Sequence, residues 1–216
     1  MAKVEEFFTA IESADLATVR GLLDSDPGLL FQRAPDGASA ALTALYNGHV
    51  PLADELAARS GSLSIYEAAA LDDTDRLTEL IEADQAVVEA WSPDGWQPLH
   101  LAAYFGRAES VRILLDADAP VQETSKNPIA VQPLHAAASG RHAEVVWLLI
   151  ASGAAVDAPQ QHGWRPLHAA AANGDAESIK ALLSAGADPD LANDDGQTAR
   201  DLAPDDAVRA LLEGGG

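Results

Sequence analysis

The feature that most constrains the fold of this chain is an internal repeat. The tripeptide Pro-Leu-His occurs at residues 98–100, 133–135 and 166–168, at intervals of 35 and 33 residues. Each copy runs into alanines, then a glycine, then an apolar stripe that ends in a doublet such as Leu114-Leu115. A period of this length is typical of a solenoid, in which each unit buries its apolar faces against its neighbours.

One unit of the repeat is predicted to be a turn, two antiparallel helices and a loop. Proline suits the first turn of a helix, because the N–H that it lacks would have no partner there. The alanines let a second helix approach closely, and the glycine ends the first helix. Apolar residues at i, i+3 and i+4 then mark a second, amphipathic helix. We expect an all-α solenoid, because no unit can bury both of its faces alone.

Two segments resemble the ankyrin repeat closely: residues 94–103, Asp-Gly-Trp-Gln-Pro-Leu-His-Leu-Ala-Ala, and residues 162–171, His-Gly-Trp-Arg-Pro-Leu-His-Ala-Ala-Ala. The family pattern is a turn glycine, Thr-Pro-Leu-His, alanines, glycine, a Val/Leu-Leu stripe and Gly-Ala. Here Gln97, Gln132 and Arg165 replace the threonine. The resemblance is strong over residues 90–190 and identifies the chain as a bacterial-type ankyrin-repeat protein. It implies helix-turn-helix units with short hairpin-like fingers.

We expect a single domain over residues 1–213, followed by a flexible Gly tail at 214–216. The domain is divided into about seven units: 4–33, 34–62, 63–90, 91–123, 124–157, 158–190 and 191–213. The third unit is expected to lack its hairpin, because its first helix follows closely on the previous unit. Asp15 takes the glycine position in the first unit, Gly140 comes one residue early in the fifth, and residues 123–129 predict a longer finger.

Three histidines stand at equivalent positions of the repeat, and we interpret them as structural. Neighbouring helices pack about 8–10 Å apart, whereas zinc needs ligand atoms about 2 Å from one metal. We therefore expect each imidazole to bond to nearby backbone, and we predict no metal, no cofactor and no catalytic residue. The residues given a structural role are His100, His135, His168, Gly95, Gly163 and Gly196.

Large aromatic side chains are the candidate contact residues. Trp96 and Trp164 follow the turn glycine, and Tyr104 and Phe105 end a first helix on the concave side. Trp, Tyr and Arg are the usual anchors of binding hot spots. The predicted partner-binding residues are Trp91, Trp96, Tyr104, Phe105, Trp164 and Arg165. The alternative is that these rings pack on adjacent fingers and stiffen the stack. Trp147, on an outer helix, is interpreted as packing against a neighbouring loop, with a second patch as the alternative.

Charge narrows the class of partner. The chain carries 34 acidic and 13 basic residues, a formal net charge of −21, and no cysteine. Such a surface repels nucleic acid and anionic membrane. We expect a cytoplasmic monomer that binds another protein, one with a basic surface if the acidity serves binding rather than solubility. The predicted function is a non-catalytic interaction module.

Two other functions are compatible with the sequence. One is an acidic inhibitor or immunity protein that blocks a cationic, nucleic-acid-binding enzyme. The other is catalysis, which would need titratable groups that converge in one pocket. The repeat spreads such groups along a ladder, and this favours a protein that is not an enzyme.

Overall fold

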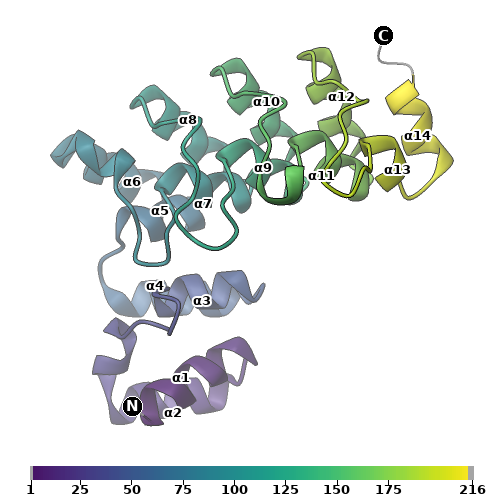
Figure 1. Cartoon of the computed structure of the whole chain (residues 1–216). Helices are drawn as coiled ribbons and strands as arrows, with labels where there is room; N and C mark the ends of the chain where they lie inside the picture. Colours follow the sequence, from purple (N-terminus) through teal and green to yellow (C-terminus); the bar gives the residue numbers. More distant parts are fainter. Residues whose placement is uncertain (1, 214–216) are drawn as a thin grey trace.

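A computed structural model describes residues 2–213, and Figure 1 shows them as an elongated stack of helices. These residues are all-helical and form seven consecutive α-helix pairs. The first three pairs are α1 (Ala2–Glu12) with α2 (Leu16–Ser25), α3 (Ala40–Tyr46) with α4 (Val50–Ser60), and α5 (Ile65–Leu71) with α6 (Thr74–Ala83). The next three are α7 (Pro98–Tyr104) with α8 (Ala108–Asp116), α9 (Pro133–Ser139) with α10 (Ala143–Ala151), and α11 (Pro166–Ala172) with α12 (Ala176–Ser184). The last is α13 (Ala199–Leu202) with α14 (Asp206–Glu213).

Short 3-10 helices lie in three of the connections: η1 (Pro27–Phe31), η2 (Gln85–Glu89) and η3 (Gln161–Gly163). No helix within residues 2–213 combines the length and the apolar character needed to cross a membrane. The predicted Gly tail at 214–216 lies outside the described residues.

The turn inside each of the first six pairs contains one residue with left-handed backbone. Glycine takes this position in the second, fourth and sixth pairs, where it adopts a positive φ without steric penalty. In the first, third and fifth pairs the residue has a side chain. The φ values are 54° at Ala14, 76° at Gly48, 64° at Asp72, 68° at Gly106, 63° at Arg141 and 63° at Gly174.

Two residues assigned to this turn lie one position from the left-handed residue. Asp15 was expected in the glycine position of the first pair, but Ala14 takes it, and Asp15 caps α2 by accepting the Thr18 N–H at 3.1 Å. In the fifth pair Gly140 keeps helical backbone with φ −79°, just before the left-handed Arg141. Glycine is required at position 140 because there is no room for a side chain: a Cβ there would collide with the ring of His142.

The first helices of the pairs form an inner layer, and the second helices form an outer layer. Alanines such as Ala103, Ala137 and Ala170 are fully buried in the inner layer, where α7, α9 and α11 pack side by side. Outer helices contribute larger side chains such as Leu114 and Leu149 to the same continuous core. Small residues inside and leucines outside let each pair bury both faces against its neighbours.

The stack is interrupted between the second and third pairs. Figure 1 shows the first two pairs set off below the row formed by the later ones. The connection from α4 to α5 spans only residues 61–64, whereas residues 84–97 join α6 to α7. Because the third pair has no finger, the finger before α7 reaches back to the second pair. A Cβ at Gly37 would lie 2.8 Å from the Pro93 carbonyl carbon, so these two turns are in direct contact.

The finger before α9 is longer than its neighbours, as its spacing predicts. Its closing bond runs from the Ser125 N–H to the Val131 carbonyl at 2.8 Å. The fingers on either side close over fewer residues, from Ser92 to Trp96 and from Gln160 to Trp164, both at 2.7 Å.

Candidate functional site

Three aromatic side chains, Tyr46, Tyr104 and Phe105, form what we call the aromatic cluster. Tyr46 ends α3, and Tyr104 and Phe105 stand at the end of α7. The Tyr46 ring stacks on Phe105 with centroids 5.9 Å apart, and Tyr104 meets Phe105 edge-on at 5.0 Å. Tyr104 is 41% exposed. The cluster therefore presents apolar surface on the inner side, across the interruption of the stack.

The cluster is held by a hydrogen bond to the finger before α7. The Tyr46 hydroxyl donates to Asp94 Oδ2 at 2.7 Å, and Asp94 also accepts a bond from the Ser92 hydroxyl. Burial, together with the negative charge of Asp94, raises the pKa of Tyr46 above its ordinary value. Tyr46 thus stays a neutral donor, and its ring is fixed between Asp94 and Phe105.

The two tryptophans of the finger before α7 are not free. Trp96 is only 8% exposed, and its ring lies 5.9 Å from that of His100. Trp91 is half-buried, and Lys126 of the next finger lies 4.1 Å above its ring, in a cation–π contact. Trp96 therefore does not present its ring at the surface, and one face of Trp91 is covered by the lysine.

The finger before α11 is tied to the one that follows. Arg165 Nη1 donates to the carbonyls of Gly163 and Ala192, both at 3.0 Å. Trp164 is half-buried, with its ring 6.0 Å from that of His168. Arg165 therefore links two fingers, while Trp164 keeps part of its ring exposed.

The repeated histidines bond to the backbone of the finger or loop that follows. The Nε2 contacts are His100 to Val131 O at 3.1 Å, His135 to Ala158 O at 2.7 Å, and His168 to Gln197 O at 3.2 Å. His168 Nδ1 also accepts the Arg165 N–H at 3.0 Å. Each imidazole thus joins an inner helix to the backbone of the next unit.

Burial lowers the pKa of His100 and His135 to about 4. Their Nδ1 atoms are buried and have no hydrogen-bond partner within residues 2–213. A proton added there would have no acceptor, so both rings stay neutral near pH 7. Nor does any group of three or more His, Asp or Glu side chains in the described part of the chain converge on a point where they could hold a metal ion.

Trp147 lies on the outer layer, at the position held by Arg112 in α8 and Lys180 in α12. It is 47% exposed. The interpretation that it packs against a neighbouring loop accounts for only part of the ring, because about half of its surface remains open. Glu144, one turn earlier in α10, pairs with Arg112 of the neighbouring helix.

Two features of the inner side were missed by reasoning from the sequence. Tyr46 was not singled out, although it precedes Gly48 by the same two residues that separate Tyr104 from Gly106. That shared register was a usable signal. The bond from Tyr46 to Asp94 had no such signal, because it joins the second pair to the fourth and depends on the missing finger between them.

Comparisons with known proteins agree with this architecture. A model of the family described as ankyrin repeats (3 copies) matches residues 7–125, 65–160 and 120–193. The chain therefore belongs to the ankyrin-repeat family, whose repeats generally bind other proteins and are typically non-catalytic.

The chain is also similar to protein phosphatase 1 regulatory subunit 12A of Mus musculus and of Rattus norvegicus, 38% identical to each over 82 residues. The match covers 38% of this chain and 8% of each relative. It thus spans only a small part of those proteins.

Proposed function

We propose that this protein binds a partner protein through its concave inner face and fingers, and that it does so without catalysis. The observation that carries the proposal is the aromatic cluster, where a partly exposed Tyr104 is backed by Phe105 and Tyr46. Rigid aromatic side chains bury a large area at small entropic cost, and such residues dominate binding hot spots.

The six predicted contact residues then divide by exposure. Tyr104, Phe105 and the open part of Trp164 are proposed to touch the partner. Trp91, Trp96 and Arg165 are proposed to support them, because their rings or donor groups are already engaged within the stack. Pre-formed fingers of this kind lose little conformational entropy on binding.

The proposed partner has a basic surface. The chain has a formal net charge of −21, and exposed carboxylates stand at the finger turns, including Asp36, Asp194 and Asp195. Charges of one sign steer an oppositely charged partner and speed association. We also propose that the protein is a monomer. Its negative charge would repel nucleic acid and anionic membranes. An acidic inhibitor of a cationic enzyme is the more specific version of this function.

Site-specific cross-linking tests the surface. A photo-reactive phenylalanine analogue is placed at Tyr104, and as a matched control at Trp147, which is similarly exposed on the outer layer. In lysate of the source cell we expect position 104 to cross-link to a distinct protein and position 147 not to. Equal cross-linking at both positions, or none at 104, would contradict the proposal.

Salt dependence of the captured complex tests the charge. We expect the association rate to fall at least tenfold between about 0.05 and 0.5 M salt, because screening shortens the reach of the acidic surface. A salt-independent rate would exclude a basic partner and with it the inhibitor version.

A further inference from the structure

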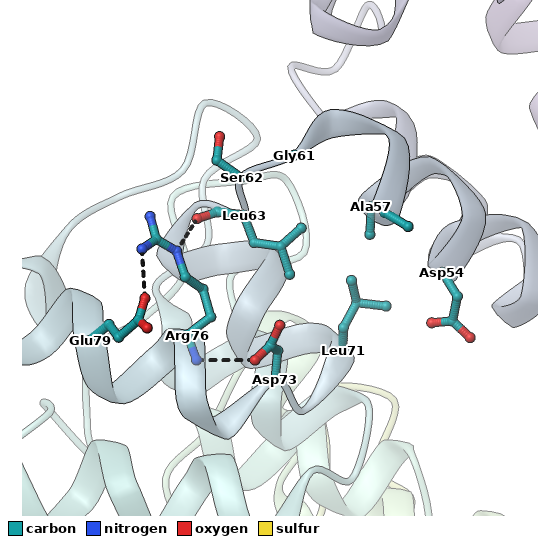
Figure 2. A pocket seen from close by; sticks show the side chains of 10 residues that line it. Asp54, Ala57, Gly61, Ser62, Leu63, Leu71, Asp73, Arg76 and Glu79 are labelled. Atoms are coloured by element: carbon teal, nitrogen blue, oxygen red, sulfur yellow. Dashed lines mark hydrogen bonds and ion pairs between the residues drawn. The ribbon is translucent and has the colours of Figure 1, made fainter.

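The short connection between α4 and α5 leaves a groove in the outer layer, which we call the junction groove. It has a volume of about 630 Å³, and Figure 2 shows it from close by. Its lining residues are Asp54, Ala57, Ala58, Gly61, Ser62, Leu63, Leu71, Asp73, Arg76 and Glu79. A second cavity of about 370 Å³ adjoins it and shares Ser62, Leu63 and Arg76.

The groove exists because α4 and α6 are splayed apart. From the third pair onward, neighbouring outer helices pack against each other, as α6 does with α8 and α10 with α12. No comparable packing joins α4 to α6. The side of α6 that faces α4 is therefore not covered by a packed outer helix, whereas the later outer helices cover each other.

The floor of the groove is apolar. In Figure 2, Ala57 of α4, Leu63 of the short connection and Leu71 at the end of α5 converge on the same space. All three are partly buried side chains that pack against the core with the rest of their surface. Their open surface is the kind that an aliphatic side chain of another molecule covers with a gain in stability.

The rim of the groove is acidic. Asp54, Asp73 and Glu79 stand around the floor, and the only basic residue of the lining is Arg76. Its guanidinium is already engaged, with Nε donating to the Leu63 carbonyl at 3.2 Å and Nη1 paired with Glu79 at 3.0 Å. Asp54 makes no ion pair within residues 2–213. Three carboxylates and one arginine that is already paired give the rim a net negative charge, which would attract a basic side chain of a bound molecule.

We propose that the junction groove binds an amphipathic helix of a partner protein, with leucine-type side chains on one face and lysines or arginines beside them. Such a helix would lie where a neighbouring outer helix packs in the regular part of the stack. Its aliphatic face would cover Ala57, Leu63 and Leu71, and its basic residues would meet Asp54 and Asp73. This is recognition of a helix in a groove, with specificity set by charge complementarity.

This site is separate from the aromatic cluster. The groove lies between the outer helices α4 and α6, whereas the cluster lies on the inner helices α3 and α7. One molecule could therefore hold two segments at once, and the two surfaces can be tested independently.

A designed peptide provides the test. The probe is a fluorescein-labelled helix of about 18 residues, with leucines at i, i+3, i+4 and i+7 and lysines at the remaining positions. Its affinity is measured by fluorescence anisotropy for the full chain. A second peptide carries glutamate in place of each lysine, and we expect it not to bind.

Two sets of variants locate the binding. Ala58→Trp, on the exposed side of α4, fills the groove, and Asp54→Lys/Glu79→Lys reverses the rim charge. The control is Asp116→Lys/Glu177→Lys, which changes the net charge equally on α8 and α12. Glu177 pairs with Lys180 much as Glu79 pairs with Arg76. We expect both groove variants to weaken binding at least about tenfold and the control to change it less than about twofold.

Several results would overturn the proposal. Absence of binding to the unchanged protein excludes this class of occupant. Equal losses in groove and control variants would show attraction to the overall charge alone. A concentration-dependent dimer that Ala58→Trp abolishes would assign the groove to a second copy of the chain. Tyr104→Ala should leave the peptide affinity unchanged, so failure of the inner-face proposal is distinguishable from failure of this one.

Discussion

Acid should destabilise this protein through its buried histidines before most carboxylates titrate. The pKa of His100 and of His135 is about 4 in the folded chain, against about 6.5 in an unfolded one. The unfolded state therefore binds more protons between these values. Stability is fully present above pH 6.5 and is lost as the pH falls toward 4. From pH 7.0 to 5.5 each histidine should remove about 1.2 kcal/mol from the unfolding free energy.

Urea unfolding followed by circular dichroism at pH 7.0, 6.5, 6.0 and 5.5 measures this loss, about 2.5 kcal/mol for the two rings. His135→Gln keeps an amide donor for the Ala158 carbonyl but does not titrate, so it should lose stability with about half of that pH dependence. Leu149→Val, another buried position of the same pair, serves as the control. It should lower stability equally at every pH. An unchanged pH dependence in His135→Gln, or an imidazole NMR titration near pH 6.5 for His135, would refute the reasoning.

Further substitutions probe other parts of the stack. Arg141→Gly relieves a left-handed φ of 63° and should raise the unfolding free energy by about 0.5–1 kcal/mol. Gly140→Ala should lower the unfolding free energy, because the added Cβ collides with the ring of His142. Thermal melts of the two variants measure both changes, and an Arg141→Gly variant that is not stabilised would contradict the first expectation. Tyr46→Phe removes the 2.7 Å bond to Asp94 and should cost about 1–2 kcal/mol in urea unfolding. Because the raised pKa of Tyr46 makes its contribution present below about pH 10 and lost above it, the gap between the two proteins should narrow in alkali; a constant gap would contradict this. Ala103→Leu overpacks the inner layer and should lower the unfolding free energy by about 1–3 kcal/mol. Ala151→Leu, at an exposed position, should leave it nearly unchanged, and urea unfolding measures both.

The repeated part of the fold could be predicted because each step of the pattern has a local cause. Proline at the first turn of α7, α9 and α11, alanines behind it and a left-handed turn residue all act within a few residues. The turn residue of the first pair was misplaced by one, at Asp15 instead of Ala14, whereas the glycine of the fifth pair lies one residue before the turn residue, as expected. Ala14 and Arg141 both have a positive φ without being glycine, so the local sequence does not mark them as left-handed residues.

The candidate site was less predictable than the fold, because exposure is decided by neighbours. Trp96 and Tyr104 both look like contact residues in the sequence, yet Trp96 packs into the stack and Tyr104 does not. Lys126, from another finger, covers Trp91, and nothing in the local sequence of either residue indicates that contact.

The sequence by itself determined a helical solenoid, because its period, its prolines and its alanines act locally and repeat. It also showed that the third unit is short. Only the tertiary structure decided the consequences of the short third unit, since they depend on how the second, third and fourth helix pairs pack against each other. The missing finger lets Asp94 reach Tyr46 on the inner side. On the outer side it leaves α4 and α6 apart, with an acidic groove between them.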